Sequence, residues 1–175
     1  MSRVPELVLF DRDGTLVRDF PYNGNPAWIR PMDGAGEALD RLRAHGVRLG
    51  VATNQSGVAR GLITLAQVEA CNARLVELLG PFDTVQVCPH GPDEGCACRK
   101  PAPGMVLAAC AELGVDPART VVIGDVAADL ESAAAAGAVG ILGPTPVTRR
   151  SEVAAAARSA DDLTQAVDDV LAGRG

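Results

Sequence analysis

The residues most able to do chemistry in this sequence are four aspartates that follow two apolar runs. Asp11 and Asp13 come directly after the run at 7–10. Asp125 and Asp129 follow a second apolar run later in the chain. Such runs are typical of buried parallel strands, and ligands bind beyond the carboxyl ends of those strands. Because carboxylates gathered at one edge repel one another unless a cation lies between them, the pattern predicts a site for a hard ion such as Mg2+.

A simpler interpretation treats these aspartates as turn and cap residues, which is their commonest use. Two elements between the acids argue against it. Thr53 and Asn54 open a polar, glycine-containing stretch after a third apolar run, a combination that can cradle phosphate. Lys100 lies before Pro101 in a loop expected to face the acids, where it could hold a phosphate and an anionic nucleophile. Together the elements predict phosphate chemistry.

In this order, the elements resemble the four motifs of haloacid dehalogenase (HAD) superfamily phosphatases. The matching positions are Asp11-Arg12-Asp13-Gly14-Thr15, then Thr53, then Lys100, then Gly124-Asp125 with Asp129. The resemblance runs from about Leu7 to Leu142, which is most of the chain. It implies a phosphomonoester hydrolase that works through an aspartyl-phosphate intermediate.

The resemblance also implies which residues carry the reaction. Asp11 would be the nucleophile, and Asp13 would be the general acid and then the general base. Mg2+ would be held by Asp11, by Asp125 and by the main-chain carbonyl of Asp13.

Other motif residues would bind the substrate. Thr53, Asn54 and Lys100 would hold the non-bridging phosphate oxygens. Asp129 would lie behind them and orient Lys100 or a metal-bound water. Arg99 would contact the substrate beyond its reacting phosphate.

A second cluster of side chains predicts a different metal. Cys88, His90, Cys96 and Cys98 place three thiols and one imidazole within eleven positions, which suits tetrahedral Zn2+. A disulfide is the alternative, but it would leave one thiol over and needs an oxidising compartment. Four protein ligands leave no position for water, so we expect a structural zinc that folds the loop 88–98 and anchors the basic pair that follows it.

Within the HAD family, the cysteine and histidine pattern resembles that of heptose bisphosphate phosphatases and of histidinol-phosphate phosphatases. The stretches 53–61 and 100–105 are similar to the heptose enzymes, whereas the short gap between His90 and Cys96 is similar to the histidinol enzymes. Both groups carry a basic residue where this chain has Val126. The resemblance favours D-glycero-D-manno-heptose 1,7-bisphosphate as substrate, with the 7-phosphate removed, and leaves histidinol phosphate as the alternative.

Two further functions are open on the motifs alone. A polynucleotide 3′-phosphatase can share a similar loop after Thr53, but the net charge of −6 argues against a nucleic-acid partner. A non-catalytic binding module would be expected to have lost an acid, and all four motifs keep theirs.

The order of apolar runs predicts the fold that positions these residues. Strand-like runs lie near 6–10, 47–52, 83–88, 119–123 and 138–142, with helical patterns between them. Alternating strands and helices indicate an α/β fold with a doubly wound, Rossmann-like parallel sheet and helices on both faces.

Several helices can be placed more closely. A capping-box pattern at Thr64 begins a helix whose apolar face would include Leu65, Val68, Cys71, Leu75 and Leu78. Further helices are predicted from near Pro103 to Gly114, over 126–136 with a stop at Gly137, and over 161–171 at the surface; the structure of 153–157 is left open. Cys71 and Cys110 are expected to be buried on helix faces.

The length of 175 residues favours one HAD-like phosphatase domain over 1–175, and we expect a monomer. The segment 17–32 is too short for a large cap domain, so loops would carry specificity. Without a signal-peptide pattern or a membrane-spanning run, we expect a cytoplasmic enzyme whose partner is a small phosphorylated metabolite rather than a nucleic acid or a membrane.

Overall fold

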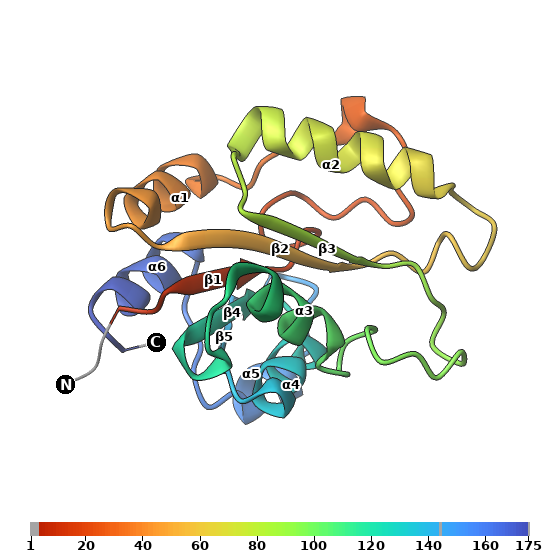
Figure 1. Ribbon diagram of the computed structural model, residues 1–175. Helices are drawn as coiled ribbons and strands as arrows, with labels where there is room; N and C mark the ends of the chain where they lie inside the picture. Colours follow the sequence, from red (N-terminus) through yellow and green to blue (C-terminus); the bar gives the residue numbers. More distant parts are fainter. Residues whose placement is uncertain (1–3, 144, 175) are drawn as a thin grey trace.

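A five-stranded parallel sheet forms the centre of the computed structural model, which describes residues 4–143 and 145–174 (Figure 1). Its strands are β1 (Leu7–Phe10), β2 (Arg48–Asn54), β3 (Thr84–Cys88), β4 (Thr120–Gly124) and β5 (Val139–Leu142). The order across the sheet is β3-β2-β1-β4-β5, with every neighbouring pair parallel. The predicted doubly wound α/β fold is therefore confirmed.

Helices cover both faces of this sheet. They are α1 (Ala35–Ala44), α2 (Leu65–Leu79), α3 (Gly104–Leu113), α4 (Ala127–Ala136), α5 (Arg150–Ala155) and α6 (Leu163–Leu171), with short 3-10 turns η1 (Pro26–Trp28) and η2 (Pro117–Arg119). Figure 1 shows α1 and α2 on one side of the sheet and α3 and α4 on the other. The last helix, α6, packs beside α1.

The central strand β1 explains why the first motif follows an unbroken apolar run. Val8 and Phe10 pack against the helices on the α1 side, whereas Leu7 and Leu9 pack against those on the α3 side. All four side chains are fully buried, and each such burial stabilises the fold by roughly 1.5–3 kcal/mol. The strand is thus held from both faces, and the aspartates that follow it start from a rigid position.

The helix boundaries follow the predicted signals. The capping box of α2 is formed, because the Gln67 N–H donates to Thr64 Oγ1 at 3.2 Å and the Thr64 N–H donates to Gln67 Oε1 at 2.9 Å. Helix α4 ends at Gly137, whose φ of 84° is a left-handed conformation that glycine adopts without strain.

One predicted helix face is wrong in part. Leu65 and Leu78 are 47% and 36% exposed, whereas Val68, Leu75 and Leu79 are buried with Cys71 between them. The buried positions step by three or four residues from Val68, so the last turn of α2 presents Leu79 rather than Leu78 to α1. Cys71 and Cys110 are buried as predicted.

Strand β2 is longer than the apolar run indicated. Thr53 and Asn54 belong to it, because they stay in register with Val87 and Cys88 of β3. The two polar residues predicted for a phosphate loop therefore stand on the end of a strand, where their backbone is fixed.

The C-terminal segment is more deeply packed than a surface helix. Helix α6 buries Leu163, Ala166, Val167 and Val170 in the core on the α1 side. The stretch left open at 153–157 lies partly in the short α5.

Residues between β1 and α1 contain only η1, and no cap domain occurs among the described residues. In the same residues, no helix is both long and apolar enough to cross a membrane.

Candidate active site

A cavity of about 250 Å³ opens beyond the carboxyl ends of β1, β2 and β4. Residues of all four motifs line it: Asp11, Asp13, Thr53, Asn54, Lys100, Asp125 and Asp129. The sheet thus brings together side chains that lie far apart in the sequence. Arg99 is not among the lining residues, since its guanidinium instead donates to the His90 carbonyl oxygen at 3.3 Å.

Lys100 is the fixed cation of this cavity. Its ammonium donates to Asp11 Oδ1 at 2.8 Å, to Asp129 Oδ1 at 2.6 Å and to the Ala52 carbonyl oxygen at 2.8 Å. The residue is only 6% exposed. Burial alone would lower the pKa of Lys100, but Asp11 and Asp129 raise it above its usual value, so the side chain stays charged.

Asp11 lies at the centre of an acidic cluster. Its backbone N–H donates to the Ile123 carbonyl oxygen at 2.9 Å, which extends the pairing of β1 with β4 and fixes the residue. One carboxylate oxygen from each of Asp11, Asp125 and Asp129 lies within 4.8 Å of the others.

Burial raises the pKa of Asp11 well above its usual range, against the opposing effect of Lys100, and the neighbouring acids raise it further. Burial and Asp129 raise the pKa of Asp125 to about 6. Three carboxylates beside one ammonium group leave two negative charges in excess, which a divalent cation would neutralise. The all-oxygen donor set fits Mg2+.

Two glycines allow the carboxylates to approach the backbone. A Cβ on Gly14, whose φ is +88°, would lie 2.3 Å from Asp125 Oδ2. A Cβ on Gly124 would lie 2.1 Å from Asp129 Oδ2. Neither position can carry a side chain without displacing an acid of the cluster.

Both carboxylate oxygens of Asp129 already have protein donors. Oδ1 accepts from Lys100, and Oδ2 accepts from the Val126 N–H at 3.2 Å. Since the side chain is also fully buried, this geometry suits a residue that orients Lys100 better than one that binds a metal directly.

The Asn54 side chain is hydrogen-bonded to the main chain of Lys100, a contact that the sequence did not suggest. Its side-chain Nδ2 donates to the Lys100 carbonyl oxygen at 3.3 Å, and its Oδ1 accepts from the Lys100 N–H at 3.1 Å. The side chain thus fixes the main chain of Lys100. Thr53 Oγ1 accepts from Gln55 Nε2 at 2.8 Å at the cavity wall.

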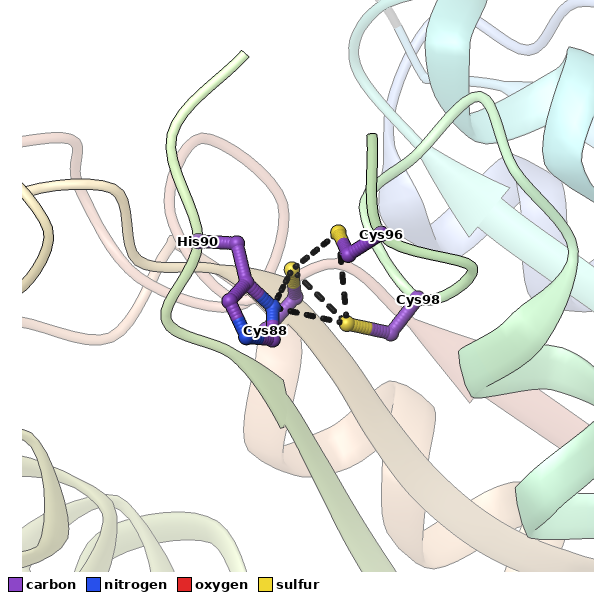
Figure 2. Close-up of side chains that lie close together, drawn as sticks. All are labelled: Cys88, His90, Cys96 and Cys98. Atoms are coloured by element: carbon purple, nitrogen blue, oxygen red, sulfur yellow. Dashed lines mark hydrogen bonds between the residues drawn. The ribbon is translucent and has the colours of Figure 1, made fainter. Parts of the chain in front are cut away.

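The second predicted cluster is also assembled. Figure 2 shows Cys88, His90, Cys96 and Cys98 pointing toward one another, from the end of β3 and from the loop before α3. The three Sγ–Sγ distances are 3.1, 3.6 and 3.7 Å. His90 Nδ1 lies 3.2 Å from Cys98 Sγ and 3.6 Å from Cys88 Sγ.

These distances fit a shared metal better than a disulfide. Tetrahedral Zn–S bonds of ~2.3 Å place two sulfur atoms about 3.8 Å apart, whereas a disulfide brings them to ~2.05 Å. Burial raises the pKa of the Cys88 thiol to about 12, so a cation is needed to hold that sulfur as a thiolate. The Arg99 N–H donates to Cys96 Sγ at 3.3 Å, which connects the cluster to the residue before Lys100.

A family model of the haloacid dehalogenase-like hydrolases matches residues 26–137. The chain belongs to this family. The match covers most of the sheet and residues of three motifs, and the remaining one, at Asp11, precedes it.

Three similar proteins within the HAD hydrolases are named heptose bisphosphate phosphatases. A Pseudomonas aeruginosa protein named D-glycero-beta-D-manno-heptose-1,7-bisphosphate 7-phosphatase is 44% identical over 141 residues, covering 77% of this chain and 78% of its own length. A Yersinia pestis protein of the same name is 35% identical and covers 95% of this chain and 97% of its own length. The solved D,D-heptose 1,7-bisphosphate phosphatase of Bordetella bronchiseptica, complexed with magnesium and phosphate, is 34% identical. It superposes with a TM-score of 0.84 and covers 95% of this chain and 98% of that chain.

The structure also adds three residues to the site of this HAD hydrolase. Arg12 and Gln55 donate hydrogen bonds to the Asp13 carboxylate, and Asn72 accepts one from Arg12. The sequence contained a signal for two of these residues, Arg12 and Asn72. An arginine inside a buried acidic motif needs partners, and Asn72 is the polar residue on the buried face of α2.

Proposed function

We propose that this chain is a Mg2+-dependent phosphatase that removes the 7-phosphate of D-glycero-D-manno-heptose 1,7-bisphosphate through a phosphorylated Asp11. The observation that carries the reaction type is the half-buried Asp11 carboxylate, held by Lys100 inside a cluster of acids. The relatives named heptose bisphosphate 7-phosphatases support this substrate over histidinol phosphate.

In the first step, an Asp11 carboxylate oxygen attacks the phosphorus in line. The new P–O bond forms as the bond from phosphorus to the leaving oxygen of the substrate breaks. The proton of the Asp13 carboxyl passes to that leaving oxygen, so the product departs as an alcohol rather than an alkoxide.

In the second step, a water oxygen attacks the phosphorus of the aspartyl phosphate, and the P–O bond to Asp11 breaks. The Asp13 carboxylate accepts the proton of the water, which returns both aspartates to their starting states. One carboxyl group serves both steps because its protonation state reverses between them.

The non-bridging oxygens need fixed positive or donor groups while charge moves through the phosphorus. We assign this task to the Lys100 ammonium, to the Thr53 hydroxyl and to the Asn54 backbone, since the Asn54 side chain is occupied with Lys100. Asp11, Asp125 and the main-chain carbonyl of Asp13 would hold Mg2+, which supplies the charge that lets an anionic nucleophile meet an anionic phosphate. Arg99 remains a predicted contact to the distal part of the substrate.

We further propose that Cys88, His90, Cys96 and Cys98 bind one structural Zn2+. The loop they form ends at Arg99 and Lys100, so its shape determines where Lys100 enters the cavity. The zinc would act on the reaction only through this positioning.

Substrate choice is tested by phosphate release from both anomers of heptose 1,7-bisphosphate, from histidinol phosphate and from a 3′-phosphorylated oligonucleotide. We expect kcat/KM for one heptose anomer to exceed that for the other two substrates by at least ~10²-fold, because a site that binds the polar groups of one substrate discriminates against substrates that lack them. Analysis of the product by NMR should show that the 7-phosphate is removed. Equal or better turnover of histidinol phosphate would reject the heptose assignment.

Zinc binding is tested by elemental analysis of protein purified without added metal or chelator. We expect one Zn2+ per chain, because structural zinc in small peptides contributes ~10–16 kcal/mol to folding. Cys96→Ser should lower the zinc content and reduce activity, while circular dichroism should still report a folded sheet. Cys71→Ser and Cys110→Ser are matched controls, since both thiols are buried away from the cluster, and they should leave the zinc content unchanged. Zinc-free protein with full activity in Mg2+ would contradict this assignment.

A further inference from the structure

Arg12 is a buried cation that the reaction above does not use. It is 1% exposed, although it lies between the nucleophile and the general acid in the sequence. Burying a guanidinium group is costly unless its nitrogens are paired. Here Nε and NH2 donate to the Asp13 carboxylate, and NH1 donates to Asn72 Oδ1 at 2.8 Å.

The two oxygens of Asp13 are held unequally. Oδ2 accepts from Arg12 Nε at 3.2 Å, from Arg12 NH2 at 3.0 Å and from Gln55 Nε2 at 2.9 Å. Among the described residues, Oδ1 accepts only the Arg12 Nε hydrogen bond at 3.2 Å. Oδ2 is therefore the anchored oxygen, and Oδ1 keeps a lone pair for a proton.

Asn72 holds the other end of this arginine. It lies on α2, on a buried face otherwise made by Val68, Cys71, Leu75 and Leu79, and is 8% exposed. A side-chain amide on an apolar face destabilises a helix that packs there unless it is hydrogen-bonded. Its bond to Arg12 connects α2 to the first motif, so the guanidinium is fixed from two sides.

We propose that Arg12 and Asn72 are positioning residues for Asp13, the general acid and base, and that Oδ1 is the oxygen that exchanges the proton. Gln55 is the second support, because its amide bridges Asp13 Oδ2 and Thr53 Oγ1. This assignment rests on the proposed phosphatase reaction. In that reaction, the Oδ1 proton goes to the leaving oxygen as its bond to phosphorus breaks, and a proton from water returns to Oδ1 as the aspartyl phosphate is hydrolysed.

The test compares Asn72→Leu, which keeps the size of the side chain and removes the acceptor, with Asn72→Asp, which keeps an acceptor oxygen. Phenyl phosphate needs a proton on its leaving oxygen, whereas p-nitrophenyl phosphate does not. We expect Asn72→Leu to lower kcat on phenyl phosphate by ~10–10²-fold, as a misplaced catalytic group does, and to leave the nitrophenolate burst rate within ~3-fold of the wild type. Asn72→Asp should restore most of the phenyl phosphate activity.

Leu79→Ala is the matched control, since Leu79 is buried on the same helix but packs against α1. It should lower the melting temperature without changing the ratio of rates on the two esters. An equal loss on both esters in Asn72→Leu would overturn the positioning role. Wild-type protein that releases phosphate neither from these esters nor from heptose 1,7-bisphosphate would instead reject the proposed function itself.

A double-mutant cycle gives an independent readout. If Asn72 acts through Asp13, adding Asn72→Leu to Asp13→Asn should lower phenyl phosphate turnover by less than ~3-fold more, because effects within one unit are not additive. If Asn72→Leu lowers phenyl phosphate turnover as much in the Asp13→Asn background as in the wild type, Asn72 does not act through Asp13. If Asn72→Leu does not fold, Asn72→Ala replaces it in the same double-mutant cycle, with the same expected results.

Discussion

Asp11→Asn is expected to lower turnover by at least ~10³-fold while the protein stays folded. Asparagine keeps the shape of the side chain but removes the charge that attacks phosphorus. The fold should persist because Lys100 keeps Asp129 and the Ala52 carbonyl oxygen as partners. Phosphate release at saturating Mg2+ measures the loss, and thermal melting reports the fold.

Asp83→Asn provides the matched control for that experiment. Asp83 Oδ2 accepts from the Leu49 N–H at 2.7 Å, outside the cavity, so its replacement should act on stability alone. Near-normal turnover by Asp11→Asn would rule out Asp11 as the nucleophile.

Asp13→Asn is expected to slow both proton transfers, each of which typically contributes ~10²–10⁴-fold. On an alkyl or phenyl phosphate, loss of the first transfer should dominate. On p-nitrophenyl phosphate the first step needs no proton, so the defect should move to hydrolysis of the intermediate. A burst of nitrophenolate followed by slow release of phosphate is the expected signature.

A different result would contradict this role: Asp13→Asn would slow turnover of esters with good and with poor leaving groups by the same factor, and no nitrophenolate burst would be seen. The carboxylate of Asp13 would then matter for its charge or its hydrogen bonds to Arg12 and Gln55, rather than for proton transfer.

The sequence predicted the elements whose signals are local. Buried parallel strands leave unbroken apolar runs, so the hydrophobic pattern alone places the ends of β1 and β4 and the acids beyond them. The capping box at Thr64 and the glycine after α4 also determine their helix ends within a few residues. For the same reason, the close spacing of the residues from Cys88 to Cys98 was enough to predict that their three thiols and one imidazole lie together.

The remaining features depend on contacts between distant segments. The buried face of α2 shifts to Leu79 because α1 packs there, which no pattern within α2 shows. The Asn54 side chain binds the Lys100 main chain instead of facing a phosphate, since β2 continues two residues further along β3 than its apolar run indicated. The Arg12–Asn72 bond joins a loop to a helix, and only the folded chain brings them together.

Residue 11 can be examined directly in the Asp13→Asn variant. Protein mixed with p-nitrophenyl phosphate and Mg2+ is quenched within the burst and treated with borohydride, which reduces an acyl phosphate and so converts the phosphorylated aspartate to homoserine. Peptide mass spectrometry should find homoserine at position 11, and none when the ester is omitted. A clear burst with unmodified Asp11, or with homoserine at another aspartate, would contradict a phosphatase that works through Asp11.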